Sequence, residues 1–359
     1  MTWNRLHYLL LGGLIILFFT VRMYFHEKSI TKLPGRISMV KKNQRSLSVE
    51  CYPTPRNMLD AREPNMTVIS PQEVEHIVFV SNIHKVKSVV SHINNELNMN
   101  ETTKLRETLN KFAIDFNGFV YLPGGHWKPK KYDDPSRVAL IIPFRNREQM
   151  LGIFLRRMVP FLLRQRLQFA IFVVEQANNL KFNRGMLANV GFKESLRFED
   201  WDCIILHDID FLPRYNNNSY TCKNMPRHLM SGIEKRPKLY FQEFNGVTGF
   251  SRQQFVMMNG APNRYWGWGG EDHDLRTRAE EIGFNIFRTE WPYGYYDHTP
   301  HQRRSYPEVE HKWKEFNQKA KQYISKDGLS NLNYPKPEIK FHSLYIHIKV
   351  NISKLPEDI

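Results

Sequence analysis

The chain has 359 residues, of which 41% are hydrophobic, and it carries a formal net charge of +15. This length suits one large domain with appendages or two domains, and the apolar content is enough to bury a sizeable core. The basic charge favours anionic partners such as nucleotide diphosphates, acidic glycans or lipid headgroups, although a solvated basic face also explains it. No nucleic-acid-binding motif accompanies the charge, so we expect no nucleic-acid partner.

Residues 6–25 are almost wholly apolar, interrupted only by His7 and Arg22, and they predict a single transmembrane helix. Twenty helical residues span about 30 Å, which is the thickness of the hydrocarbon core. The run is long for a cleaved signal peptide, and no small-x-small cleavage site follows it. We therefore expect a cytosolic tail at residues 1–5 and a transmembrane signal-anchor at residues 6–25.

The orientation of this anchor receives conflicting signals. Cationic residues beyond the span outnumber the single Arg5 before it, which alone would place the bulk of the chain in the cytosol. Glycosylation sequons beyond the span favour a luminal location instead. These sequons are at Asn65, Asn100, Asn217 and Asn351.

Residues 26–123 give weak structural signals. Lys, Asn, Ser and Pro are frequent, and only residues 68–80 and 86–112 show some helical spacing. We interpret this segment as a luminal stem with short helices. Cys51 lies in it, whereas Cys203 and Cys222 lie 19 residues apart around a Pro- and Asn-rich turn. For this pair a disulfide loop and two buried thiols are both open.

From residue 138 onward, strands and helices alternate. Apolar runs at residues 138–143, 169–174 and 203–206 predict buried parallel strands. Residues 150–164 and 183–192 predict helices between them. This alternation implies an α/β sheet that binds ligands at the carboxyl ends of its strands. Arg145, Arg147 and Arg184 follow those ends, where a phosphate would bind.

Two further motifs carry metal-binding side chains. Asp208 and Asp210 follow the third strand at i and i+2, and oxygen ligands of this kind suit Mn²⁺ or Mg²⁺ bridged to a substrate phosphate. His298 and His301 are three residues apart and can share a metal. A neutral histidine pair on a surface loop is the alternative.

Residues 265–274 read Tyr-Trp-Gly-Trp-Gly-Gly-Glu-Asp-His-Asp. Glycines let a backbone approach a ligand closely, and an indole offers a flat apolar face to a sugar ring. The carboxylates can hold sugar hydroxyls or accept a proton from one. The alternative is a buried aromatic turn before a helix, whose dipole Glu271 and Asp272 would favour.

Five segments resemble the β-1,4-galactosyltransferase family in order and spacing. They are PFRNR at residues 143–147, FNRGMLANVGF at 182–192, DIDFLP at 208–213, YWGWGGEDHD at 265–274 and DGL at 327–329. The resemblance implies a nucleotide-diphospho-sugar transferase fold of the GT-A type, α/β with a mostly parallel central sheet. It also implies a catalytic domain at residues 124–345, a C-terminal tail at 346–359, and a single-pass type II Golgi membrane protein with a luminal catalytic domain.

The resemblance assigns roles by position. Asp272 matches the catalytic base, and Glu271 stands beside it on the sugars. The metal ligands would be Asp210, His298 and His301. His298 replaces a methionine found in many members, and imidazole is a harder ligand than a thioether. We therefore expect Mn²⁺ as the cofactor, with a changed balance between Mn²⁺ and Mg²⁺ that makes Mg²⁺ the second candidate. The positions that match the uridine diphosphate-sugar site are Pro143, Phe144, Arg145, Arg147, Phe182, Arg184, Asp208 and Trp268.

Other positions concern selectivity and covalent structure. Tyr240 matches an aromatic residue near the acceptor, and Gly270 is expected among the positions of acceptor and donor selectivity. Glu243 stands where a tyrosine or a smaller apolar residue helps to decide between galactose and N-acetylgalactosamine, and Asn245 replaces one of two glycines that follow. Cys203 and Cys222 match the family disulfide. Tyr132 stands at the usual partner position of Cys51, which is left free or pairs between chains.

The expected function is an inverting, metal-dependent transfer of galactose or N-acetylgalactosamine from the uridine diphosphate-sugar to the 4-hydroxyl of a terminal N-acetylglucosamine. Members that use xylose carry a His-x-His metal pair, whereas this chain has His-x-x-His. Three alternatives stay open: a catalytically inactive glycan-binding or scaffold relative, a membrane protein whose basic stem binds glycosaminoglycans, and a metal hydrolase. A homodimer is also left open.

Overall fold

In a computed structural model, the chain divides into two compact units, Met1–Pro53 and Thr54–Ile359. The structure describes residues 63–96, 102–131, 135–233, 243–299 and 310–353, all of which belong to the second unit. The expected cytosolic tail and transmembrane helix lie outside these residues. Among the helices within the described ranges, none is both long and apolar enough to cross a membrane.

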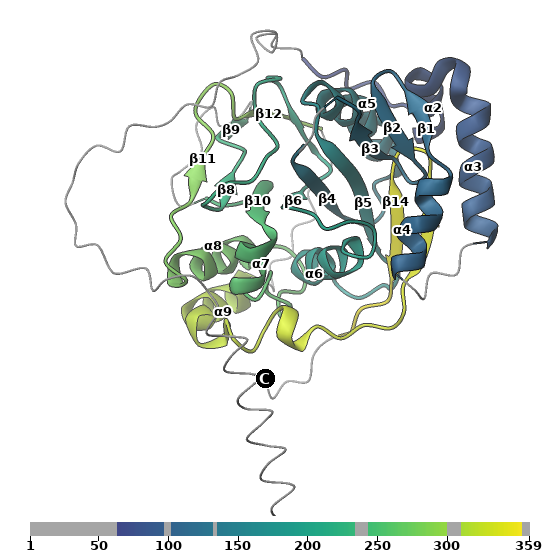
Figure 1. The fold of residues 1–359 in the computed structure, drawn as a ribbon. Helices are drawn as coiled ribbons and strands as arrows, with labels where there is room; N and C mark the ends of the chain where they lie inside the picture. Colours follow the sequence, from purple (N-terminus) through teal and green to yellow (C-terminus); the bar gives the residue numbers. More distant parts are fainter. Residues whose placement is uncertain (1–62, 97–101, 132–134, 234–242, 300–309, 354–359) are drawn as a thin grey trace, which may run out of the picture. The chain divides into compact units, whose positions relative to one another are not determined.

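The centre of the second unit is a twisted sheet whose four middle strands run parallel (Figure 1). They are β14 (Ile346–Val350), β5 (Gln168–Gln176), β4 (Arg137–Phe144) and β6 (Cys203–His207), in that order. Strands β4, β5 and β6 are nearly continuous apolar runs because layers on both faces bury them. The parallel core and the three strands expected from the sequence are confirmed.

Antiparallel strands extend this sheet on both sides. On one side stand β3 (His126–Pro129), β2 (Phe119–Leu122) and β1 (Ile114–Phe116), and β13 (Glu338–Phe341) pairs with β14. On the other side β6 pairs antiparallel with β10 (Val247–Ser251), followed by β8 (Arg227–His228) and β11 (Phe287–Arg288). A separate small sheet has the order β7 (Phe211–Pro213), β12 (Tyr295–His298) and β9 (Gly232–Ile233).

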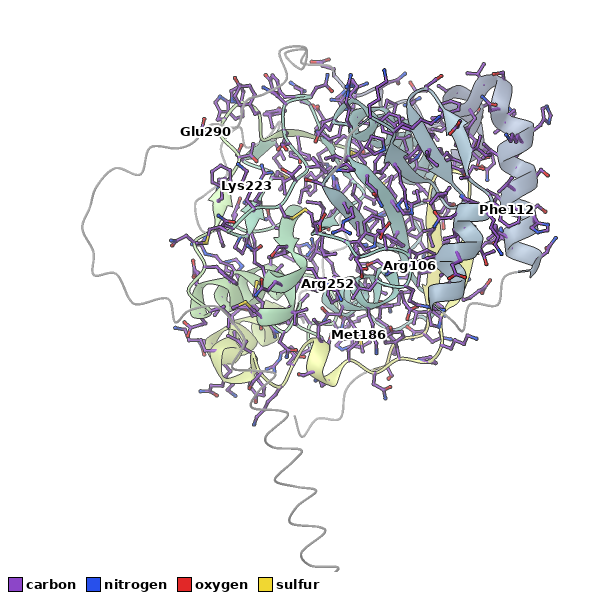
Figure 2. All side chains as sticks on the ribbon, in the orientation of Figure 1. Arg106, Phe112, Met186, Lys223, Arg252 and Glu290 are labelled. Carbon is purple, nitrogen blue, oxygen red and sulfur yellow. A yellow bond between two sulfur atoms is a disulfide. The ribbon has the colours of Figure 1, made fainter. Side chains whose placement is uncertain are left out.

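Helices connect the parallel strands, as expected from residues 150–164 and 183–192. They are α5 (Glu148–Arg164) and α6 (Arg184–Ser195). A Cβ on Gly191 of α6 would lie 2.5 Å from Ile141 and 2.8 Å from Val174, so only glycine lets the helix pack this closely on β4 and β5. Side chains fill the layer between α6 and the sheet, where Met186 is fully buried (Figure 2).

The remaining helices surround this core. Short helices precede the sheet, as the spacing of residues 68–80 and 86–112 suggests: α2 (Pro71–Phe79), α3 (Ile83–Glu96) and α4 (Thr102–Lys111), with a 3-10 turn at Val80–Asn82. The later helices are α7 (Arg252–Met257), α8 (Glu271–Glu281) and α9 (Glu310–Tyr323), with a 3-10 turn at Leu329–Asn331. Helix α2 packs on α5, and α8 packs on α9.

Two expected domain boundaries are wrong. The boundary at residue 124 separates β2 from β3, although these strands pair along their whole length. Helix α4, placed in the stem, is joined to the domain by an Arg106–Asp200 ion pair of 3.1 Å, and Arg252 of α7 approaches the same carboxylate at 3.4 Å (Figure 2). The tail expected at residues 346–359 begins with β14, which pairs with β5 near the middle of the sheet. Short strands of three to five residues give little periodicity from which to predict them.

Candidate active site

A cavity of about 770 Å³ opens where β4, β5 and β6 end. This is the edge at which an open parallel sheet binds ligands, because the loops that leave its strands diverge there. Most of the residues singled out in the sequence line it. They are Pro143, Arg145, Arg147, Phe182, Arg184, Asp208, Asp210, Glu243, Trp268, Gly270, Glu271, Asp272 and His298.

Some expected site residues lie elsewhere. Phe144 is the last residue of β4, is only 4% exposed and does not line the cavity, so it supports the site from the core. Tyr240 and His301 lie outside the described residues. Of the sequon asparagines, Asn65 and Asn351 are exposed, Asn217 is half-buried, and Asn100 is not among the described residues.

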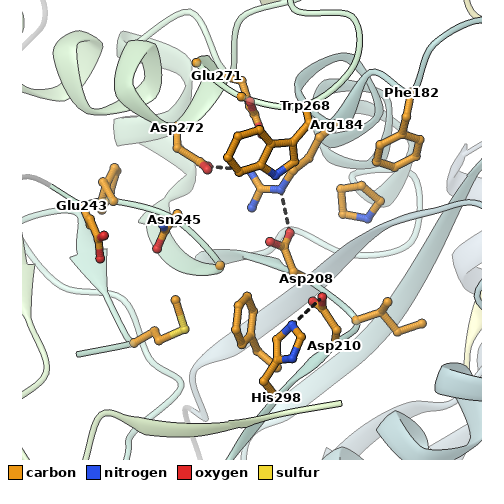
Figure 3. Close-up of a pocket in the computed structure, with 18 of the residues that line it drawn as sticks. Phe182, Arg184, Asp208, Asp210, Glu243, Asn245, Trp268, Glu271, Asp272 and His298 are labelled. Atoms are coloured by element: carbon orange, nitrogen blue, oxygen red, sulfur yellow. Dashed lines mark hydrogen bonds and ion pairs between the residues drawn. The ribbon is translucent and has the colours of Figure 1, made fainter. Parts of the chain in front are cut away.

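Arg184 links the carboxylates of two distant motifs (Figure 3). Its Nε donates to Asp208 Oδ1 at 2.6 Å, and its Nη1 donates to Asp272 Oδ1 at 3.0 Å. Arg184 is the first residue of α6, whose N-cap is Asn183. The Asn183 side chain accepts a hydrogen bond from the Met186 amide at 2.9 Å and is fully buried, so the helix start is fixed. The guanidinium therefore holds the strand-end aspartate and the first turn of α8 in one arrangement.

The electrostatics of these groups follow from their crowding. Burial, with smaller effects from the neighbouring Asp210 and Glu271, raises the pKa of Asp208 to about 6 against the opposing effect of Arg184. Burial also raises the pKa of Asp272, with Glu271 and Asp208 adding to the effect and Arg184 opposing it. The Asp272 side chain keeps 27% of its surface exposed to the cavity, which moderates the shift. The pocket is thus rich in negative charge and favours a cation.

The first turn of α8 owes its position to glycines. Gly270 is its N-cap with φ of 93°, and Gly267 and Gly269 have φ of 107° and 103°, values that other residues rarely adopt. The Gly267 amide donates to the Phe182 carbonyl at 2.8 Å, which joins this loop to the opposite wall. Trp268 is 68% exposed at the cavity, so the alternative of a wholly buried aromatic turn is wrong for this residue.

One side of the cavity is built for a planar group. The Arg145 guanidinium lies 5.3 Å from the centre of the Phe182 ring and donates to the Leu180 carbonyl at 2.5 Å. A flat aromatic face beside a fixed cation is suited to a nucleotide base and its phosphates. Arg147 lines the same side. Arg145, Arg147 and Arg184, which follow successive strands in the sequence, thus line one cavity.

Asp210 and His298 form the candidate metal pair. His298 Nε2 lies 3.2 Å from Asp210 Oδ2. Strand pairing brings them together, because His298 of β12 stands opposite Phe211 of β7, the residue after Asp210. Two ligands of one octahedral ion at about 2.1 Å stand roughly 3 Å apart, so this pair fits a divalent cation. Within the described ranges no third histidine, cysteine or carboxylate completes a metal cluster.

Three buried polar atoms on the cavity wall have no hydrogen-bond partner among the described residues. They are Arg184 Nη2, Asn245 Oδ1 and Glu271 Oε2. Buried polar atoms are nearly always paired, so three unpaired ones around one cavity indicate a polar ligand that pairs with them. Asn245 stands out in the sequence only as a replacement for glycine, and no local signal in the sequence marks it as a site residue.

Cys203 and Cys222 form a disulfide with an S–S distance of 2.03 Å. This confirms the expected pairing and rejects the alternative of two free thiols. The bond joins the start of β6 to the loop that follows β7. Tyr220 in that loop is fully buried, and its hydroxyl lies 2.9 Å from Nε2 of His207, the residue that precedes Asp208 in the sequence. The disulfide therefore braces the segment beneath the Asp208–Asp210 motif. Cys51 lies outside the described residues.

Comparisons with known proteins identify the family. The family model described as the N-terminal region of glycosyl transferase group 7 matches residues 84–223, and that described as the N-terminal domain of galactosyltransferase matches residues 227–302. β-1,4-Galactosyltransferase 5 of Mus musculus is 37% identical over 318 residues, which cover 88% of this chain and 80% of that protein. The chain belongs to the β-1,4-galactosyltransferase family. The expectation drawn from the five motifs is confirmed.

Other similarities agree with this membership. β-1,4-Galactosyltransferase 6 of Homo sapiens is 44% identical over 238 residues, 66% of this chain, and the match spans about three fifths of that relative's length, 61%. Among solved structures, the Drosophila β-1,4-galactosyltransferase 7 mutant in complex with manganese, UDP-Gal and xylobiose has a TM-score of 0.52 at 27% identity. The matched region covers 60% of this chain and 94% of the chain in that structure. The galactosyltransferase similarity supports the expected GT-A type fold.

Proposed function

We propose that this chain is a metal-dependent, inverting glycosyltransferase that moves galactose from uridine diphosphate-galactose to the 4-hydroxyl of a terminal N-acetylglucosamine. The acceptor is carried by a glycoprotein or glycolipid. The observation that carries this proposal is the position of Asp272, joined through Arg184 to Asp208 in the cavity that also holds the Asp210–His298 pair. The galactosyltransferase relatives and the neighbour solved with UDP-Gal support the choice of donor.

The donor binds across the ends of the parallel strands. Phe182 and Arg145 receive the uridine, and Arg147 and Arg184 bring positive charge to the diphosphate. As the bond to the sugar breaks, negative charge develops on the leaving uridine diphosphate, where fixed cations stabilise it. Trp268 offers its exposed indole face to a sugar ring beside these groups.

Asp272 serves as the general base. It accepts the proton of the acceptor 4-hydroxyl while that oxygen attacks the anomeric carbon from the face opposite the diphosphate, so an α-linked donor gives a β-linked product. Arg184 favours the ionised carboxylate that this step needs, against the burial that raises its pKa. Glu271, whose buried Oε2 is unpaired among the described residues, holds acceptor hydroxyls beside it.

Asp210 and His298 would hold Mn²⁺, the ion present in the complex of the Drosophila neighbour, and Mg²⁺ is the second candidate. When bound, a divalent ion supplies positive charge to the diphosphate oxygens. Five carboxylates and three arginines line this cavity, so the excess of negative charge favours a bound cation. The carboxylates are Asp208, Asp210, Glu243, Glu271 and Asp272.

The test is a transfer assay on the full-length chain in detergent. It uses Mn²⁺ and a β-linked N-acetylglucosamine acceptor with, in parallel, uridine diphosphate-galactose and uridine diphosphate-N-acetylgalactosamine. We expect a β-1,4-linked galactose product that is lost when the metal is chelated. Binding of uridine diphosphate without product from either donor would support the inactive relative, and release of free sugar without an acceptor would support the hydrolase.

The proposal includes a location in the Golgi membrane, single-pass type II, with the catalytic domain in the lumen. The apolar residues 6–25 and the four sequons support it. Exposed Asn65 and Asn351 are accessible to glycosylation, whereas the side-chain oxygen of Asn217 is buried. Expression in cells followed by glycosidase digestion should shift the mass of the wild type, and Asn65→Gln with Asn351→Gln should remove most of that shift. An unmodified wild-type chain would contradict the luminal location.

A further inference from the structure

The space between the metal pair and Asp272 has its own wall. In the proposed reaction, on which this inference rests, the transferred sugar must lie between the diphosphate at Asp210 and His298 and the hydroxyl activated by Asp272. Figure 3 shows Glu243 and Asn245 at this part of the cavity, on the side opposite Phe182. These two side chains come from the loop before β10.

Three hydrogen bonds hold the backbone at Asn245 and Gly246. The Asn245 carbonyl lies 2.8 Å from Nε2 of His228, a fully buried residue of β8, and also accepts from the Val247 amide at 2.8 Å. The next residue, Gly246, accepts from the Asp208 amide at 2.9 Å. The loop is therefore tied directly to the strand end that carries Asp208, and the backbone that carries the Asn245 side chain is held beside the cavity.

That side chain has an unmet hydrogen bond. Asn245 Oδ1 is buried and has no donor among the described residues. A buried acceptor without a donor is costly, so a fold retains it where a ligand supplies the donor. Glycine at this position would remove the side chain and its requirement. The surrounding space is the one that the transferred hexose occupies, and the donors that a hexose offers are its hydroxyls.

We infer that the Asn245 side-chain oxygen accepts a hydrogen bond from one hydroxyl of the hexose being transferred, and that Asn245 is a donor-specificity residue. A site that pairs a buried acceptor with a substrate hydroxyl rejects the analogue without that hydroxyl, because the acceptor is then left unpaired. The loop that presents Asn245 adjoins Asp208, so hydroxyl recognition and diphosphate binding belong to one rigid wall.

The test measures the transfer rates of the wild type and of Asn245→Gly with each of several donors. The donors are uridine diphosphate-galactose and its 2-, 3-, 4- and 6-deoxy analogues. We expect the wild type to lose roughly 10–100-fold in kcat/KM with one deoxy donor. For Asn245→Gly, the kcat/KM values with that deoxy donor and with uridine diphosphate-galactose should differ by no more than about threefold. If the variant discriminates against every deoxy donor as strongly as the wild type does, the assignment is overturned.

A matched control is Asn146→Gly, which removes another cavity-lining carboxamide, at a backbone position with φ of 52° that glycine adopts readily. It should keep the wild-type discrimination among the deoxy donors, and a loss equal to that of Asn245→Gly would overturn the inference. Asn245→Ala repeats the comparison if the glycine variant does not fold. Calorimetric dissociation constants for the same donors separate this inference from the proposed function. If neither protein transfers sugar, but Asn245→Gly loses the preference in donor binding that the wild type shows, the role of Asn245 is supported and catalysis is rejected.

Discussion

Arg184 determines how the charges of the cavity are arranged. Burial works to lower its pKa, but Asp208, Asp272 and Glu271 together outweigh that effect and raise it, so the guanidinium stays charged. With its side chain 11% exposed, it is shielded from solvent and its hydrogen bonds keep their strength. A lysine could not contact both aspartates in this forked geometry.

The role of Asp272 can be tested with its isosteric amide. Asp272→Asn keeps the shape of the side chain and removes the proton acceptor, so transfer should fall by roughly 10²–10⁴-fold. Binding of uridine diphosphate-galactose should change by only a few-fold, because Arg184 keeps its bond to Asp208. Initial rates and calorimetric binding constants measured on the same preparation check both statements. Transfer within about threefold of the wild type would reject Asp272 as the base.

At the scale of elements, α8 is held by a buried ionic network. Arg278 Nε donates to Asp274 Oδ1 at 2.6 Å, and its Nη1 donates to the Asp327 carbonyl at 2.6 Å. The Tyr265 hydroxyl donates to Asp274 Oδ2 at 3.0 Å, so the first residue of the aromatic motif is fastened to its last. Asp327 belongs to the DGL motif, and its Oδ2 also accepts a hydrogen bond from Arg264 Nε. The network thus fixes the helix turn that carries Asp272.

Removing the cation from this network should be severe. Arg278→Leu leaves the fully buried Asp274 without its ion-pair partner and removes one of the two arginines that contact Asp327, and a broken buried ion pair costs about 3–5 kcal/mol of unfolding free energy. Arg276→Leu on the same helix is the matched control, because its Glu280 partner is 49% exposed and such pairs are worth less than about 1 kcal/mol. Urea titrations measure the free energy of unfolding of both variants. Equal losses in the two variants would contradict a special role of the buried network in stability.

The disulfide allows a second prediction at this scale. A cross-link over a sequence separation of 19 residues stabilises a fold by about 3 kcal/mol, chiefly through the unfolded chain. Cys222→Ala should therefore lower the urea midpoint by a corresponding amount. Because the loop places Tyr220 beneath His207 and Asp208, donor affinity should fall as well. An unchanged midpoint in oxidising buffer would show that the bond does not constrain the protein in solution.

The sequence predicts those elements whose signal is local. The apolar runs of β4, β5 and β6 and the polar residues after them required no tertiary information. The closeness of Asp210 to His298 depends on the pairing of β7 with β12, and the position of Asn245 depends on Val247 of β10 lying opposite His207 of β6. Such long-range pairings have no local pattern. The sequence does not predict strand β14 for the same reason, since its five residues form a strand only by pairing with β5.

At the scale of the whole molecule, four histidines with lowered pKa values control the response to acid. Burial lowers the pKa of His126 and His228 to about 3 and that of His207 and His342 to about 4, so all four are neutral in the native state at pH 7. In the unfolded chain each titrates near 6.5. As the pH falls from 6.5 toward 4, these histidines bind protons in the unfolded state but stay neutral in the native state. The free energy of unfolding therefore decreases across that range.

The size of this loss is predictable. From pH 7 to pH 5 each buried histidine should cost on the order of 2 kcal/mol of unfolding free energy. Asp208 acts in the opposite direction, because its raised pKa of about 6 lets the native state gain a proton by pH 5. Urea unfolding at both pH values with a metal chelator measures the sum. His126→Gln should reduce the histidine contribution to the pH dependence by about a quarter, since four histidines share it, whereas His84→Gln, on the exposed face of α3, should leave it unchanged. Stability that stays constant from pH 7 to pH 5 in the wild type would mean that these histidines become protonated without unfolding.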